Sequence, residues 1–283
     1  MDAAQLNTKL KMIEGRKQQG ILTGKMRTYE FIFIPCAGFL NSNMPLLNNA
    51  ELKLSFDRNF AEVSLLKSKI DVSVSLANKP IIIRDCYAIT EYISSEGLRN
   101  YFSRIDTSPI IYNYEQCEIT LKNLPLNETV MRLDNIKGGN TPTCLFAGII
   151  PTSALNGSFT LSSNQFTNCD VDTINITLNG NAVNGYPIDI ANGSPIHMLQ
   201  KFYDVTNRLM NPLASDGLGC AKFKYNWLYS HRFEGEISKQ GWIGMNIKLS
   251  TPYTVPHTLV IWTIQNTAIS IDKFHQIERL QIN

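Results

Sequence analysis

Histidine and cysteine are the side chains best able to do chemistry in this chain, and their spacing does not favour it. The four histidines stand alone, with no second His or Cys at the spacing of metal ligands: His197, His231, His257 and His275. Zinc and iron sites are built from closely spaced ligands of these types, so we expect no metal site. His197 falls at the start of a predicted helix, where we expect a capping or packing role, and His231 falls at the predicted end of a strand.

The six cysteines lie far apart and form no C-x-x-C pair: Cys36, Cys86, Cys117, Cys144, Cys169 and Cys220. We interpret them as reduced, small hydrophobic residues in strands. A nucleophilic Cys-His pair with Cys86 or Cys220 would need a base beside the thiol, and both cysteines lie in or next to apolar, strand-like sequence. The sequence therefore offers no support for a thiol nucleophile.

Glycine, tryptophan and acidic residues likewise form no pattern that indicates catalysis or cofactor binding. The stretch 137–140 (Lys-Gly-Gly-Asn) lacks the pattern of a phosphate-binding loop, and we expect a turn there. The stretch 241–245 (Gly-Trp-Ile-Gly-Met) contains no serine nucleophile, and its glycines are expected to allow a bulge or a close backbone approach beside a packed indole. Core packing is the expected role of Trp227, Trp242 and Trp262. No acidic pair is placed for hydrolysis. We predict a protein that is not an enzyme, with no catalytic, cofactor-binding or metal-ligating residue and no cofactor.

Strand signals dominate the chain. Alternating or β-branched runs, broken by Asn, Gly and Pro, predict strands at 29–35, 50–56, 61–66, 70–76, 81–93, 110–121, 130–136, 144–150, 173–178, 222–229, 243–249, 258–264 and 276–282. Asn-Gly pairs at 179–180, 184–185 and 192–193 mark turns. Many short strands with such breaks predict an all-β protein, an antiparallel sandwich or barrel.

Two short helices are expected in the connections. The first covers about 95–103, where Leu98, Tyr101, Phe102 and Ile105 share one face, and it should lie over a sheet edge or end. The second has Ser194 as N-cap, Pro195 at its first position and an apolar stripe that ends before Pro212. A helix that ends near 104–109, followed by a strand from Ile110, makes this junction the best domain boundary.

Composition limits the possible partners. The chain has 283 residues, with 26 Lys and Arg against 24 Asp and Glu, a formal net charge of +2. This balance is too mild for a nucleic-acid binder, although a basic N-terminal segment could make a weak contact: Lys9, Lys11, Arg16, Lys17, Lys25 and Arg27. Only 18% of residues are charged, and the uncharged polar residues Asn, Thr and Ser are abundant in their place. No window predicts a leader or a membrane span, so we expect the chain to stay in the cytosol or nucleus.

Several segments, in this order, resemble a known family. They are Pro45 to Arg58, Leu98 to Phe102, Asn135 to Gly139 running on to Leu145–Gly148, Ile176 to Gly180, Gly241 to Gly244, Thr258 to Trp262 and Asp272 to His275. From about Met12 onward the chain resembles major capsid proteins of the double jelly-roll, hexon-like type. The resemblance is greatest to those of Polinton or Maverick elements and adintovirus-like elements of animals.

The resemblance implies a division of the chain. Residues 1–107 would hold a basic N-terminal segment and the C-terminal part of a first jelly roll with a bridging helix, and residues 108–283 the second jelly roll. That family's first jelly roll begins farther upstream, so we expect its N-terminal strands to be missing here, as in a truncated, split or domesticated gene. The expected fold is a complete C-terminal jelly roll plus a partial N-terminal one, with two short helices in connections.

The sequence leaves three hypotheses for the function of the protein. The first is a structural virion protein, a major capsid subunit or its domesticated remnant, which packs side by side into pseudo-hexagonal homotrimers and meets penton-like capsid proteins. Its place would be the virion, and the host cytoplasm or nucleus during assembly. The second is a jelly-roll module that binds carbohydrate or protein. The third, an enzyme of cupin type, would need a His-x-His pair that the sequence lacks.

Overall fold

The computed structural model describes residues 95–158, 160–163, 165–166, 170–190, 196–206, 227–233, 240–274 and 276–281. The strands expected before residue 94, the basic N-terminal segment and the turn at 192–193 lie outside these residues. So do Ser194, Pro195 and His275. In the described ranges, no helix is long and apolar enough to cross a membrane.

The described strands form two antiparallel sheets. In chain order they are β1 (Ile110–Asn123), β2 (Val130–Asn140), β3 (Cys144–Pro151), β4 (Val171–Leu178), β5 (Asn181–Ala182), β6 (Ile188–Asp189), β7 (Tyr229–Arg232), β8 (Gln240–Leu249), β9 (His257–Ile271) and β10 (Ile277–Gln281). Sheet A has the order β1-β9-β3-β7, with β10 also paired to β9. Sheet B has the order β2-β8-β4-β5, with β6 also paired to β4.

The chain passes from one sheet to the other at almost every long connection. Strands β1, β3, β7 and β9 belong to sheet A, while β2, β4 and β8 lie between them in sequence and belong to sheet B. Alternation of this kind between two packed antiparallel sheets is the topology of a jelly roll. The expected all-β jelly-roll sandwich is therefore confirmed for the described residues.

The core follows the period of two that the sequence predicts. Alternate side chains of each strand point between the sheets and are buried there. They are Leu145, Ala147 and Ile149 of β3, Leu259 and Ile261 of β9, Ile174, Ile176 and Leu178 of β4, and Ile243, Met245, Ile247 and Leu249 of β8. Burial of apolar side chains from both sheets is what holds the two layers together.

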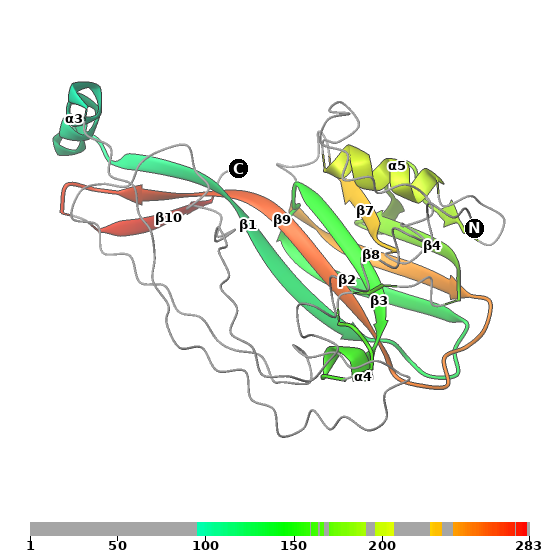
Figure 1. Cartoon of the computed structure of the whole chain (residues 1–283). Coiled ribbons are helices and arrows are strands. Elements are labelled where there is room, and N and C mark those ends of the chain that lie inside the picture. The colour runs from blue at the N-terminus through cyan, green and yellow to red at the C-terminus, as the bar shows by residue number, and fades with distance from the viewer. Residues whose placement is uncertain are drawn as a thin grey trace, which may run out of the picture.

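Sheet A is longer than sheet B. Strands β1 and β9 have 14 and 15 residues, whereas β2 and β8 have 11 and 10. At about 3.3 Å per residue, β9 spans about 50 Å and β8 about 33 Å. Figure 1 shows the β1–β9 ribbon running past the other strands to β10 and α3 (Glu96–Phe102). The predicted end of the strand at 258–264 is wrong, because β9 continues to Ile271, where it pairs with β1 and β10.

Polar side chains mark the place where the sandwich ends. Glu118 of β1 accepts from Gln265 Nε2 at 3.2 Å and pairs with Lys137 of β2. Farther along the extension, Arg279 of β10 donates to Gln116. These groups bond to one another across strands on the inner face of sheet A. Beyond this line, Phe102 and Ile105 cover a small apolar cluster of Ile110, Tyr112 and Ile271.

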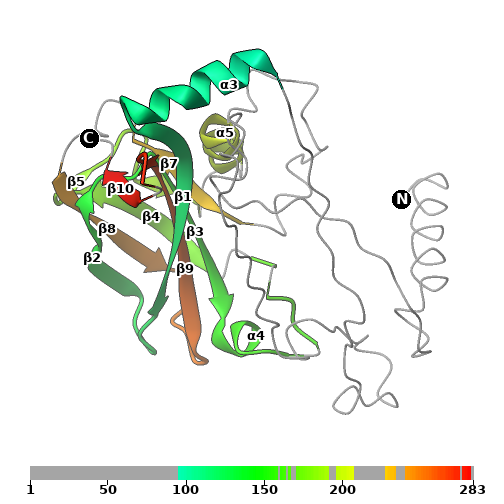
Figure 2. The same cartoon turned by 90° about the vertical axis from the view of Figure 1, so that its left-hand side faces the viewer.

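The helices close the ends and an edge of sheet A. Ser95 caps α3, accepting from the Leu98 N–H at 3.2 Å, and the helix continues as a 3-10 turn, η2 (Ser103–Asp106). Phe102 and Ile105 pack on a small cluster at the start of β1, which confirms the predicted cover over a sheet end (Figure 2). A second helix, α5 (Ile196–Val205), lies against β7, and a short helix that we did not predict, α4 (Thr152–Leu155), follows β3.

Two predicted local features have different outcomes. Asn179 and Gly180 have φ of 53° and 82° and form the tight turn between β4 and β5, as expected. The turn expected at 137–140 is instead the end of β2, where Gly138 and Gly139 pair with Trp242 and Gly241. Of the strand expected at 222–229, residues 222–226 lie outside the described residues and Tyr229 begins β7. His231 is next to the last residue of β7, at the strand end that the sequence predicts.

The contrast between the two faces of sheet A can be measured. Ile149 is 0% exposed in the core and Ile119 is 63% exposed on β1. We expect Ile149→Ala to lower the free energy of unfolding by about 2–5 kcal/mol, because it leaves a cavity. Ile119→Ala should change it by no more than about 0.5 kcal/mol. Urea denaturation of both variants tests this, and equal losses would contradict the assigned faces.

Candidate functional site

The titratable side chains of the described residues are dispersed. His197 lies exposed on α5, His231 is buried in β7, and His257 stacks on Tyr253 at 4.0 Å between ring centroids. Within the described ranges, no three His, Cys, Asp or Glu side chains come together as a metal site would require. Cys117 in β1 and Cys144 in β3 form no disulfide, and the other four cysteines lie outside the described residues.

The side chain of His231 lies in an apolar environment. Its ring is 5% exposed and meets Phe233 and Tyr186 edge-on, at 4.7 and 5.8 Å between centroids. Its Nδ1 atom has no hydrogen-bond partner among the described residues. Desolvation lowers the pKa of His231 to about 4, helped by Lys201 and opposed by Asp204 on α5. The imidazole is therefore neutral near pH 7 and packs as an aromatic ring.

One outer face of the sandwich is apolar and only partly covered. On the side of sheet A that faces away from sheet B, Ile150 and Val260 are buried with Phe166 and Ala154. Phe166 packs directly on Gly148, where an added Cβ would lie 2.5 Å from its ring, and meets Trp262 at 5.4 Å. This cover lies over β3 and β9.

The cover does not reach β1. On the same outer face, Cys117, Ile119 and Leu121 form a row along β1, which we call the β1 stripe. Ile119 and Leu121 are 63% and 52% exposed, and Cys117 is also exposed. The stripe lies in register with Ile264, Trp262 and Val260 of β9, so it continues the covered apolar surface. Burial and the nearby Glu118 carboxylate raise the pKa of the Cys117 thiol, which leaves this row uncharged.

The backbone edge beside the stripe is also open. Strand β1 ends the order of sheet A, and no described strand pairs with its other side along 110–123. An open edge next to exposed apolar side chains is a surface that other chains can bind. At the opposite edge of the sheet, α5 packs against β7.

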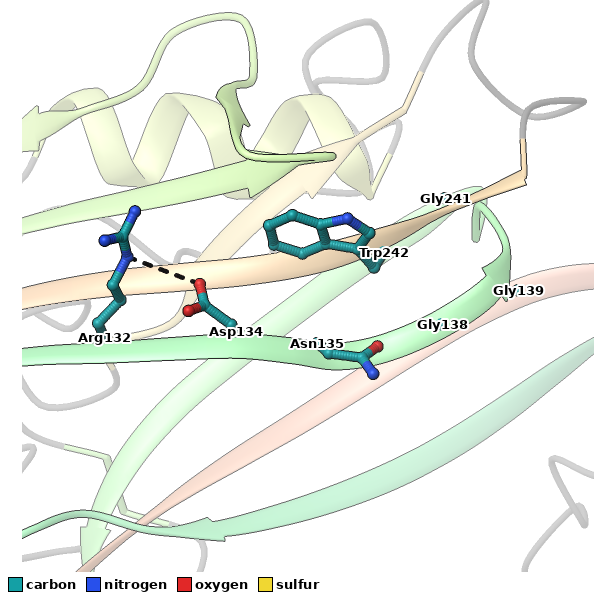
Figure 3. A pocket seen from close by; sticks show the side chains of 7 residues that line it. All are labelled: Arg132, Asp134, Asn135, Gly138, Gly139, Gly241 and Trp242. Carbon is teal, nitrogen blue, oxygen red and sulfur yellow. Dashed lines mark ion pairs between the residues drawn. The ribbon is translucent and has the colours of Figure 1, made fainter.

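A second feature lies on the outer face of sheet B. Here a shallow hollow of about 730 Å³ is lined by Arg132, Asp134, Asn135, Gly138, Gly139, Gly241 and Trp242 (Figure 3). The core-packing role expected of Trp242 is wrong, because the buried residues of β8 are its alternate neighbours Ile243 and Met245. The expected close approach of backbone to indole is confirmed: a Cβ on Gly244 would lie 3.2 Å from the ring.

The other two tryptophans pack inside the protein, as the sequence suggests. Trp227 is 9% exposed and belongs to the main core. Trp262 is half-buried and packs with Phe166 in the outer cluster of sheet A. What sequence reasoning missed was the face of Trp242. The signal was present, because Ile243 and Ile247 of the same strand fix the core-facing set and place Trp242 opposite.

Comparisons with known proteins return only distant likenesses. No protein-family model and no curated protein matches the sequence. Among solved structures, a chain of the PBCV-1 virus capsid is similar at TM-score 0.39 and 11% identity, over 67% of this chain and 55% of that one. The mavirus major capsid protein is similar at TM-score 0.39 and 10% identity, over 62% and 42%.

A chain from the structure of the Sputnik virophage is similar at TM-score 0.39 and 12% identity, over 62% of this chain and 39% of that one. The chain thus spans about half the length, or less, of these structural neighbours. Likeness at such TM-scores carries no argument about function. The jelly-roll fold is established here by the strand order and the pairing.

The buried histidine gives a pH dependence. Between about pH 6.5 and 4 the unfolded chain binds a proton at His231 that the folded chain does not. Stability should therefore fall as the pH falls through this window, by about 1–3 kcal/mol. We expect His231→Phe to flatten this part of the curve in urea denaturation from pH 4 to 7, and the exposed His197→Phe to leave it unchanged. An unaltered slope in His231→Phe would contradict the assignment.

Proposed function

We propose that this protein is a structural subunit of a shell, a hexon-like major capsid protein or its domesticated remnant. The observation that carries the proposal is the β1 stripe, an uncovered apolar row at the open edge of a rigid jelly roll. Exposed apolar surface of this kind marks a site of contact with another protein. The partner that fits a shell is a second copy of the chain.

The character of the stripe suits repeated contacts between copies. Its neighbours on the same face of β1 are Asn113, Glu115 and Asn123, so only one of them is charged. Burying such a face removes few ions from water, and the apolar row gains from burial. Low overall charge, 18% of residues with a net of +2, keeps the repulsion between copies small.

The proposal extends to the whole chain through the sequence resemblance. Residues 108–283 would be the second jelly roll, and residues 1–107 would hold the basic segment and the C-terminal part of the first, with the bridging helix. Copies would pack side by side as homotrimers and meet penton-like capsid proteins, in the virion and, during assembly, in the host cytoplasm or nucleus. The basic N-terminal segment would contribute at most a weak contact with nucleic acid. No step in this role requires catalysis.

Self-association should be visible in solution. One chain has a mass of 31.9 kDa, and we expect light scattering at high concentration to give three times this mass for the full chain. A variant with Ile119→Lys and Leu121→Lys should remain monomeric at those concentrations, because two charges would have to be buried without partners.

The matched control is Val130→Lys, which adds a charge at an apolar residue that is 63% exposed, like Ile119, but lies on β2 of sheet B. It should assemble like the unchanged protein. A strictly monomeric protein at every concentration would overturn the proposal. So would unchanged assembly of the double variant.

A further inference from the structure

From the hollow on sheet B we infer a second binding site, for neutral saccharides. It is independent of the proposed shell contact, because the hollow and the β1 stripe lie on the outer faces of opposite sheets. Its elements are the indole of Trp242, the Arg132–Asp134 pair and the glycines between β2 and β8. Figure 3 shows the indole extending along β8 toward this pair.

Glycines make the hollow. Directly across from Trp242 on β2 stands Gly138, and the next pair along the ladder is Gly139 with Gly241. Gly138 therefore places no side chain of its own beside the indole, and Asn135 Oδ1 lies 3.1 Å from the position that a Cβ on Gly138 would take. The register of β2 also shifts between Leu133 and Lys137, where Asn135 has a φ of 52°. A bulge at this point bends the strand and opens the outer face further.

The backbone at Trp242 is fixed by two hydrogen bonds, and the indole packs on the sheet beside it. The backbone N–H of Trp242 donates to Asn179 Oδ1 at 2.9 Å, and its backbone carbonyl accepts from the backbone N–H of Asn179 at 2.9 Å. The ring lies over the backbone at Gly244, where an added Cβ would be 3.2 Å away. Gly244 thus occupies the side of the ring toward the sheet, and the half-buried ring also lines the hollow. A ring held in advance loses little entropy on binding.

Polar groups stand at one end of the ring. Arg132 Nε lies 3.7 Å from Asp134 Oδ1, and the two side chains are 76% and 61% exposed. The guanidinium and the carboxylate lie side by side at this distance, with donors and an acceptor open to water. A ligand can therefore receive hydrogen bonds from Arg132 and donate to Asp134 at the same place.

This combination favours a sugar over other ligands. A pyranose ring offers an apolar C–H face to the indole and hydroxyl groups, each donor and acceptor, to the ion pair. The charges of the lining side chains cancel, one Arg against one Asp, so the site has no preference for anions. Nucleic acid would need a surplus of basic side chains to hold its phosphates.

The site can be tested with the full chain on an array of neutral oligosaccharides, including chitohexaose, xylohexaose, mannohexaose and maltoheptaose. Heparin and a single-stranded oligonucleotide serve as anionic probes. We expect saturable binding to at least one neutral oligosaccharide, and a loss of about tenfold or more in affinity on Trp242→Ala. Asp134→Ala should also weaken binding, while Trp242→Phe should retain part of it.

Lys248→Ala is the matched control, because Lys248 lies exposed on the same face of β8 and outside the hollow. Its affinity should equal that of the unchanged protein. Circular dichroism of each variant separates loss of binding from loss of fold. Binding to none of the neutral oligosaccharides, equal binding by Trp242→Ala, or binding to the anionic probes alone would overturn the inference.

The same variants separate this site from the proposed function. Trp242→Ala should retain the oligomeric mass of the unchanged protein in light scattering. The Ile119→Lys and Leu121→Lys double variant should lose that mass and retain saccharide binding. A negative result for saccharide binding therefore does not affect the test of self-association, and the reverse also holds.

Discussion

A sheet in a sandwich can bury on its inner face only what the opposite sheet covers, and the two sheets of this protein differ in length. Strands β1 and β9 outrun β2 and β8 by several residues, and the apolar core stops where Glu118, Gln265 and Lys137 bond to one another. Beyond that line β10 pairs with β9 within sheet A, and Phe102 and Ile105 cover the cluster at the start of β1. Among the described strands, β1 is the long edge strand of sheet A and pairs only with β9.

The alternation of side chains along each strand, which builds the core, also decides which side chains lie on the two outer surfaces. Ile243 and Met245 point between the sheets, so Trp242 must point away from them, onto the outer face of sheet B. On sheet A the outward set of β1 contains Ile119 and Leu121, which the cluster around Phe166 does not reach. We propose the first of these surfaces for contact with a small polar ligand that has an apolar face, and the second for contact with a second copy. The two do not compete, because the sandwich separates them.

Much of this fold could be predicted from the sequence. The strands that begin at Ile110 and Cys144 were expected from their alternation, as was the part of β8 from Ile243 to Leu249. The helix cover near residue 100 and the Asn179-Gly180 turn were also expected. The end of β2 was missed because Gly138 and Gly139 are typical of turns. They stay in the ladder here because β8 pairs with them. The length of β9 was missed because Gln265 and Asn266 interrupt its apolar pattern, and only pairing with β1 shows that the strand continues. The hollow depends on which residues face each other across two strands, and a single sequence does not contain that register.

Amide hydrogen exchange along β1 tests most directly whether this open edge is the contact between copies. The full chain would be compared at low and high concentration, with residues 117–123 followed against the core strand β4. The account predicts that exchange in 117–123 slows as the mass rises, while β4 remains equally protected throughout. Assembly that leaves exchange in 117–123 unchanged would show that copies meet elsewhere, and would contradict it.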